Sequence, residues 1–217
     1  MAVYLLDNLS VIFAGPTTGK SFLQSAYPNS IVDYDDILKE QIPEYLKAQP
    51  WTKRNVESYK AEFDEWDKKR IDATMPVVEK VIADGKLLIT NMIDRALLDA
   101  IPQNQLVKNS RYPADSGKMS LPIGFYRESP DDIHAVMAAR MKSNPDGGHF
   151  VNSIRQVRNW TKGVKKFVEA EGLVQQMVYL QPGTYLSDVL KVSRNGKTFI
   201  DGPLASAKTK HSRDSAS

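Results

Sequence analysis

The chain has 217 residues, contains no cysteine and carries a formal net charge of +3. This length suits one α/β domain, and the lack of cysteine excludes disulfides, zinc–thiolate sites and thiol nucleophiles. No apolar run is long enough to span a membrane, and the N-terminal stretch lacks the basic and apolar regions of a signal peptide. We therefore expect a soluble, cytoplasmic protein, whose mildly basic charge permits a phosphate-rich partner.

Residues 9–14 form an apolar run that predicts a buried strand, and a helix up to Ala26 is expected after the loop that follows. In the stretch AGPTTGKS, Gly19, Lys20 and Ser21 complete the phosphate-binding P-loop pattern, with Ala14 in place of its first glycine. Such a loop holds phosphates with backbone N–H groups and a lysine, and its serine ligates Mg²⁺. The sequence therefore predicts ATP and Mg²⁺ as cofactors, held by Gly15, Pro16, Thr17, Thr18, Gly19, Lys20, Ser21 and Phe22.

A second short strand is expected at residues 30–33, and three carboxylates, those of Asp33, Asp35 and Asp36, stand at its carboxyl end. In a doubly wound sheet this end lies beside the P-loop, so we expect the carboxylates near the γ-phosphate. One of them can act as general base toward an attacking hydroxyl, and Asp33 and Asp36 join Ser21 as the expected metal-site residues. The alternative is that Asp33 or Asp35 only caps the next helix.

The rest of the chain alternates predicted helices and strands. Residues 36–84 are expected to be mostly helical, with a break at Gln49–Pro50, and are followed by a buried strand at 86–92, a short helix at 95–101 and a polar loop at 103–120. A strand at 121–126, helices at 130–141 and 151–171, and a strand at 175–180 complete a mainly parallel sheet with helices on both faces. Asn195-Gly196 predicts a small hairpin over 192–200, and the composition of 204–217 predicts a disordered tail.

The order of strand, P-loop, second strand and acidic turn resembles that of the P-loop nucleoside, nucleotide and polynucleotide kinases. Tyr34-Asp35-Asp36 is similar to the Arg-Asp-Asp turn in the 5′-kinase domain of phage polynucleotide kinases, where the first aspartate is the general base. The resemblance implies a P-loop NTPase three-layer fold, with one kinase domain over residues 1–203, and assigns the base to Asp35. This sequence differs from the family in having Tyr34 where the family has an arginine. A phage-encoded protein of this kind would act in the host cytosol.

Positive charge on the transferring phosphoryl group is expected from Lys20 and from Arg127, Arg155 and Arg158, in a region at 127–170 that resembles the lid of nucleotide kinases. On the predicted helix at 151–171, the basic residues share one face beside an apolar stripe, so they either face a phosphate-filled cleft or form a solvated surface: Arg155, Arg158, Lys162 and Lys165.

The strand at 86–92 ends in Asn91, where motor ATPases and helicases normally have a carboxylate pair. This favours a kinase that moves the γ-phosphoryl group of ATP to a hydroxyl on a nucleoside, nucleotide or nucleic acid, with a polynucleotide 5′-hydroxyl and a hydroxymethylated DNA base among the open acceptors. Aromatic residues of the 36–84 segment either pack in the core or stack on an acceptor base. The alternatives are a nucleoside monophosphate acceptor, an NTPase of the helicase or packaging type, whose P-loops GPTTGKS also resembles, and a degenerate P-loop that only binds.

Overall fold

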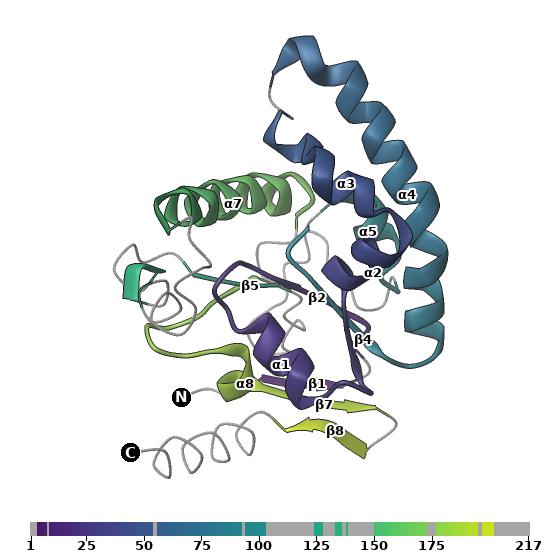
Figure 1. Ribbon diagram of the computed structural model, residues 1–217. Helices are drawn as coiled ribbons and strands as arrows, with labels where there is room; N and C mark the ends of the chain where they lie inside the picture. Colours follow the sequence, from purple (N-terminus) through teal and green to yellow (C-terminus); the bar gives the residue numbers. More distant parts are fainter. Residues whose placement is uncertain are drawn as a thin grey trace.

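At the centre of the molecule is a five-stranded parallel sheet (Figure 1). The computed structural model describes residues 4–7, 9–53, 56–92, 94–102, 124–127, 133–135, 138, 150–172, 177–194 and 197–201. The strands lie in the order β3-β4-β2-β5-β6 and are β2 (Val11–Ala14), β3 (Ile31–Asp33), β4 (Leu87–Thr90), β5 (Gly124–Tyr126) and β6 (Met177–Tyr179). The prediction of an α/β fold with a mainly parallel sheet is confirmed.

The strand that leads into the P-loop lies in the middle of this sheet. β2 pairs with β4 on one side and with β5 on the other, and β4 in turn pairs with β3. Every residue of β2 and β4 is buried, as expected for parallel strands that are covered on both faces. Because the strands are parallel, the loops after β2, β3 and β4 begin at the same edge of the sheet.

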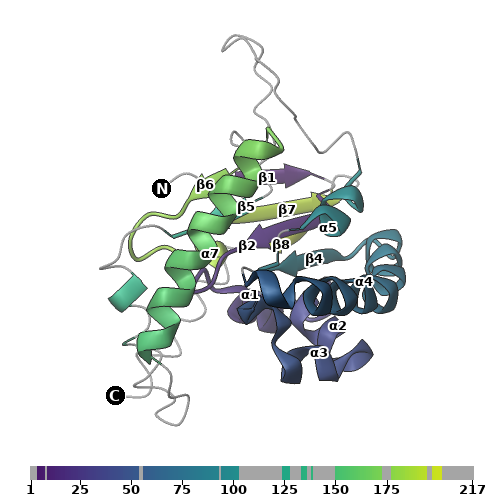
Figure 2. The same cartoon turned by 90° about the horizontal axis from the view of Figure 1, so that it is seen from above.

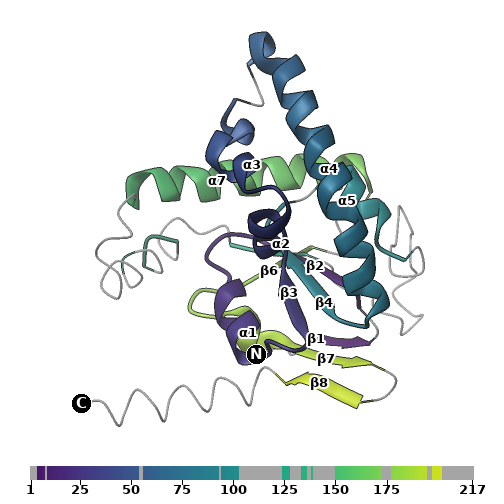
Figure 3. The ribbon, with the colours of Figure 1, turned by 45° about the vertical axis from the view of Figure 1, so that its right-hand side comes forward.

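Helices lie on both faces of the five-stranded sheet. Figure 1 shows α4, α5 and α7 on one side and α1 and α8 on the other, Figure 3 again shows α1 on the side opposite to α4 and α7, and Figure 2 looks down on α7 as it crosses β5. The helices are α1 (Lys20–Ala26), α2 (Tyr34–Gln41), α3 (Pro43–Ala48), α4 (Lys60–Ala83), α5 (Arg95–Asp99), α7 (Phe150–Ala170) and α8 (Leu186–Val189), with short 3₁₀ turns at Pro50–Thr52 and Glu57–Tyr59. None of the helices in the described ranges combines the length and apolarity that crossing a membrane requires.

A second, three-stranded sheet contains the predicted hairpin. β7 (Leu190–Arg194) and β8 (Lys197–Asp201) are antiparallel, which confirms the hairpin, and β1 (Tyr4–Asp7) pairs in parallel with β7. The sequence did not predict β1, because a four-residue strand whose partner lies at the other end of the chain leaves no local turn or periodicity signal.

The buried side of α4 differs from the expected apolar stripe. The spacing of Val56, Tyr59, Phe63 and Trp66 in the sequence predicts one apolar stripe on a helix. Val56 and Tyr59 instead precede α4 and are 45% and 39% exposed, so this prediction is wrong for both residues. The buried residues of α4 include a charged and a hydroxyl side chain: Arg70, Thr74, Val78 and Val81. Apolar periodicity cannot detect a buried side that is partly polar.

Three predicted features fall outside the described residues. They are the polar loop at 103–120, the tail at 204–217 and most of the helix expected at 130–141.

Candidate phosphate-binding site

The P-loop joins β2 to α1 at the carboxyl edge of the sheet. Ala14 is the last residue of β2 and pairs with Phe125, so an alanine in extended backbone fits where the strict motif has glycine. Gly19 has a φ of 92°, which favours glycine, and no described side chain caps the helix that begins after it. The N–H groups in the first turn of α1 therefore have no side-chain acceptor within the described part of the chain.

The loop is held by hydrogen bonds on several sides. The Thr18 hydroxyl donates to the Gly15 carbonyl over 2.7 Å, the Gly15 N–H donates to the Phe125 carbonyl over 2.9 Å, and the Leu186 N–H donates to the Thr18 carbonyl over 2.9 Å. Thr17 has a positive φ of 68°, and its buried hydroxyl has no partner among the described residues. An unpaired buried hydroxyl is costly, so this loop is suited to a polar ligand that would satisfy it.

The structure brings Lys20 together with two of the predicted carboxylates. Its Nζ lies 3.0 Å from both carboxylate oxygens of Asp33 and 3.3 Å from Oδ2 of Asp35. Asp33 also accepts the N–H of Asp35 over 3.1 Å and so caps α2. Asp33 therefore caps the helix, which was the alternative drawn from the sequence, and it also lies beside the P-loop lysine, while its role in metal binding stays a prediction.

The three aspartates have different surroundings. Burial raises the pKa of Asp33 above its ordinary value, although the Lys20 ammonium opposes this effect. Asp36 accepts hydrogen bonds from Lys39 at 2.7 Å and Gln24 at 2.6 Å, and these bonds lower its pKa. The side chains of Asp35 and Asp36 are 39% and 43% exposed, against 7% for Asp33, and of the two exposed carboxylates it is Asp35 that lies against Lys20.

No group of three or more His, Asp or Glu side chains in the described ranges is arranged to hold a metal ion. The predicted metal-site residues Ser21, Asp33 and Asp36 include only two carboxylates, and their role in metal binding stays a prediction. Mg²⁺ is commonly bound by one or two protein ligands together with substrate phosphates and water, and the exposed Ser21 at the start of α1 fits that arrangement.

Tyr34 lies in a buried network. Its hydroxyl is 2.8 Å from the Thr74 hydroxyl and accepts a hydrogen bond of 2.8 Å from Arg70, which is fully buried. Arg70 also pairs with Asp67 at 2.8 Å and with Asp94 at 2.7 Å. Burial disfavours the charged guanidinium, but the carboxylates, above all that of Asp94, hold the pKa of Arg70 above its ordinary value.

This network holds the acidic turn, Tyr34-Asp35-Asp36, in position through the buried hydroxyl of Tyr34. Tyr34 stands immediately before Asp35, and Asp94 caps α5 by accepting the Leu97 N–H over 2.9 Å. Arg70 thus ties the start of α2 to α4 and to the segment after β4. Sequence reasoning missed Arg70, because an arginine in a charged helical stretch gives no sign that it is buried.

Arg127 binds backbone carbonyls around the P-loop. Its Nε donates to the Thr17 carbonyl over 3.0 Å, and its terminal nitrogens donate to the carbonyls of Thr184 and, at 3.5 Å, Gln181. The guanidinium also lies 4.9 Å from the ring centroid of Tyr185. Arg127 is nearly fully buried, so this placement does not support the predicted contact with a transferring phosphoryl group. We assign it instead as a clamp that positions the loop.

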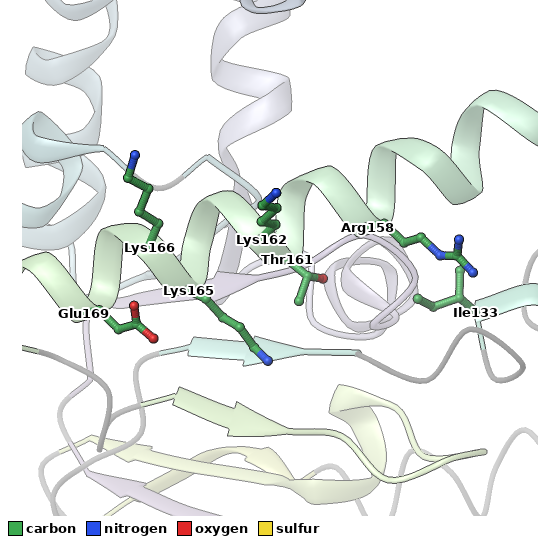
Figure 4. A pocket seen from close by; sticks show the side chains of 7 residues that line it. All are labelled: Ile133, Arg158, Thr161, Lys162, Lys165, Lys166 and Glu169. Carbon is green, nitrogen blue, oxygen red and sulfur yellow. The ribbon is translucent and has the colours of Figure 1, made fainter. Parts of the chain in front are cut away.

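Helix α7 contacts the P-loop through Trp160. A Cβ on Gly15 would lie 2.6 Å from the Trp160 ring, and the indole N–H donates to the Asn91 carbonyl. Arg158 is two residues away on the helix, is exposed, and lines a groove with Ile133 (Figure 4). The structure therefore does not bring Arg158 to the phosphate loop, and the side chain of Arg155 lies outside the described part of α7.

The aromatic residues of the 36–84 segment divide between core and surface. Tyr45 is buried, and its ring centroid is 5.5 Å from that of Trp51 and 6.3 Å from that of Trp66. Trp51 is 40% exposed and Tyr59 is 39% exposed. Core packing therefore accounts for Tyr45, while the rings of Trp51 and Tyr59 remain partly accessible.

Comparison of the chain with protein-family models gave no match, and comparison with curated proteins gave none. The class that the structure itself defines is an α/β protein with a five-stranded parallel sheet. A finer assignment of function depends on the residues around the P-loop.

Proposed function

We propose that this protein is a P-loop kinase that transfers the γ-phosphoryl group of ATP to a hydroxyl on a nucleoside, nucleotide or nucleic acid. The observation that carries the proposal is the meeting of Lys20 with Asp33 and Asp35, at 3.0 Å and 3.3 Å, beside the loop after β2. Open α/β sheets bind their ligands at the carboxyl ends of the strands, which is where this cluster lies. Phosphoryl transfer to a hydroxyl uses positive charge on the phosphates and a carboxylate that accepts the hydroxyl proton, and this cluster contains groups of both kinds.

The donor half consists of the P-loop and Lys20. The unpaired Thr17 hydroxyl, the N–H groups at the start of α1 and the exposed Ser21 are the groups that would hold a triphosphate and its metal. Bound Mg²⁺ would neutralise charge on the phosphates. Lys20 lies at only 10% exposure between the carboxylates, and turning its amine toward phosphate oxygens would release Asp35 from the ion pair.

The acceptor half begins at Asp35. An acceptor hydroxyl would attack the γ-phosphorus, its proton would pass to the Asp35 carboxylate, and the bond from that phosphorus to the bridging oxygen of the departing diphosphate would break. Asp33 is occupied as a helix cap and Asp36 by its bonds to Gln24 and Lys39, so Asp35 is the carboxylate best placed to accept a proton. The buried link from Tyr34 to Arg70 would keep the turn that carries Asp35 in position.

A P-loop NTPase three-layer fold is the finer assignment that accompanies this proposal. It is supported by the strand–loop–helix unit of β2 and α1 in the middle of a parallel sheet with helices on both faces. A motor NTPase is less favoured, because Asn91 follows β4 and its carbonyl accepts the Trp160 N–H. A nucleoside monophosphate acceptor would already be anionic and would gain little from a base.

The test is to incubate the protein with γ-labelled ATP and separate pools of nucleosides, nucleotides, single-stranded DNA, duplex DNA and RNA. We expect label in one of the pools, and none when Lys20→Ala replaces the wild type. Label that appears only as inorganic phosphate, and faster with nucleic acid, would replace this proposal with a motor NTPase. No binding of ATP by calorimetry would leave a protein that only resembles a kinase.

A further inference from the structure

An open groove of about 460 Å³ runs along α7 on a side that the proposed kinase chemistry does not use. Arg158 and Lys162 are each two positions from Trp160 and so project from roughly the opposite side of the helix to the ring that covers Gly15. Figure 4 shows Arg158 extending toward Ile133 and Lys165 extending from α7 toward β5. The lining residues are Ile133, Arg158, Thr161, Lys162, Lys165, Lys166 and Glu169.

The groove is strongly cationic. Its lining has four basic side chains and one carboxylate, so its net charge of +3 equals the formal charge of the entire chain. From Phe150 to Val168 the sequence of α7 contains no acidic residue. The excess positive charge of the protein is therefore concentrated here.

The cations on α7 are spaced so that they repel one another. Arg158, Lys162 and Lys166 follow one another at intervals of four residues, where like charges are neighbours and destabilise a helix. Within the described residues these three side chains form no ion pair. On α4, by contrast, Lys68 pairs with Asp72 at the same spacing, at 2.8 Å. An anion lying along α7 would remove the repulsion.

The shape and surroundings indicate what kind of anion fits. The row from Arg158 to Lys166 is about 12 Å long at 1.5 Å per residue, so it forms a track rather than a point site. Beside it, the Lys165 ammonium lies 5.7 Å from the ring centroid of Tyr126, which is 5.9 Å from that of Tyr179. A cationic track next to aromatic rings is the combination by which proteins bind single-stranded nucleic acids, because the cations follow the phosphates and bases stack on the rings.

We propose that the groove along α7 binds the phosphate backbone of a single-stranded nucleic acid. This goes beyond the proposed kinase activity, because the groove lies away from the P-loop and the binding requires no ATP. A nucleic acid held here can be a substrate of the site or a separate anchor for the protein.

The test is fluorescence anisotropy with a labelled oligothymidylate of about 16 nucleotides, in the absence of ATP. The variant Lys162→Gln/Lys166→Gln removes two cations from the groove, and Lys60→Gln/Lys80→Gln removes two exposed cations from α4 as a matched control. Single-stranded nucleic acids lose affinity with a log–log salt slope of about −0.7 per phosphate contact, so the groove variant should lower that slope by about 1.4 in magnitude and weaken binding by about 25-fold at 0.1 M salt. The control should bind as the wild type does.

A stacking variant, a competitor and a stability control separate binding of single-stranded nucleic acid in the groove from nonspecific charge attraction and from a folding defect. Tyr179→Leu should weaken binding about fivefold without changing the salt slope, since stacking carries no charge. Equal loss in the two double variants, an unchanged affinity in Tyr179→Leu, or competition by polyglutamate as effective as that by unlabelled oligothymidylate would each overturn the proposal. Matching thermal unfolding of the double variants keeps a folding defect from being mistaken for lost contacts.

Lys20→Ala distinguishes this proposal from the proposed kinase activity. It removes the P-loop lysine and should bind the oligothymidylate as the wild type does. If it lost that binding, the nucleic acid would lie at the P-loop and the groove assignment would be wrong. If the wild type bound the oligothymidylate but transferred no phosphoryl group, that result would count against the kinase proposal alone.

Discussion

Replacing Arg127 by methionine tests whether this residue is a clamp on the P-loop rather than a residue that contacts the transferring phosphoryl group. Methionine keeps an unbranched, largely apolar side chain but removes the donors that reach the carbonyls of Thr17, Thr184 and Gln181. The contact with the Thr17 carbonyl is an ordinary hydrogen bond of 3.0 Å, and the contact with the Gln181 carbonyl is long at 3.5 Å. The variant therefore leaves at least two carbonyls without their charged donor in a buried setting.

The expected loss of stability follows from those contacts. A hydrogen bond to a charged group contributes about 1.5–3 kcal/mol, and a buried acceptor left unpaired costs about 1–3 kcal/mol. We therefore expect Arg127→Met to lower the free energy of unfolding by about 3–5 kcal/mol, a large part of the stability of a typical domain. Looser anchoring of Thr17 should also weaken ATP binding by at least about tenfold, which corresponds to 1.4 kcal/mol.

The assay is urea unfolding followed by circular dichroism, together with calorimetric titration of ATP. Arg158→Met is the matched control, because Arg158 is exposed, and it should change the free energy of unfolding by no more than about 0.5 kcal/mol. Arg127→Lys should be intermediate, since a lysine amine cannot reach the separate carbonyls with a planar fork. A loss below about 1 kcal/mol with unchanged ATP affinity would refute the clamp.

Three further predictions concern other parts of the site. Arg70→Met leaves the Asp94 carboxylate without its buried partner and should lower the free energy of unfolding by about 3–5 kcal/mol. Adding Asp94→Asn should restore part of that loss. Strictly additive losses of the two substitutions in urea unfolding would contradict the pairing. Gly15→Ala places a Cβ 2.6 Å from the Trp160 ring and should shift the indole fluorescence and weaken ATP binding; unchanged spectra and affinity would show that the ring does not pack on the loop. The pKa of Asp36 is lowered by the hydrogen bond from the lysine three residues later, so the stabilisation is present above its unfolded value of 3.8 and is lost as the pH falls through the folded value. Asp36→Asn should abolish this pH-dependent stabilisation, which amounts to a few tenths of a kcal/mol because the carboxylate is partly exposed. If the free energy of unfolding fell equally in the wild type and the variant as the pH was lowered, that result would speak against the bond.

The elements around the P-loop were predictable from the sequence because their signals are local. A continuous apolar run identifies β2, a glycine-rich motif identifies the loop, and the proline after Tyr27 marks the end of α1. The end of α2 at Gln41 was not predicted, because the expected break lay at Gln49–Pro50. The hairpin of β7 and β8 was also predictable, since Asn195-Gly196 lies between β-prone segments. The approach of Asp33 and Asp35 to Lys20 followed from the rule that parallel strands end at one edge.

The tertiary roles of charged residues could not be predicted in this way. Arg70 and Arg127 are both buried. Arg70 pairs with Asp67 and Asp94 and donates to the Tyr34 hydroxyl, whereas Arg127 donates to backbone carbonyls that are distant in sequence. The basic face of α7 was visible in the sequence, but which way it points was not. That orientation follows from the packing of Trp160 on Gly15.

Transfer of the γ-phosphoryl group by Asp35→Asn, compared with Asp36→Asn, most directly tests the central claim that Asp35 is the base beside Lys20. The two variants make the same chemical change on adjacent residues of α2, measured with γ-labelled ATP and whichever acceptor the wild type labels. Loss of a general base should lower kcat by about 10²- to 10⁴-fold in Asp35→Asn, while Asp36→Asn retains most of the activity. Full transfer by Asp35→Asn, or an equal loss in both variants, would contradict the assignment.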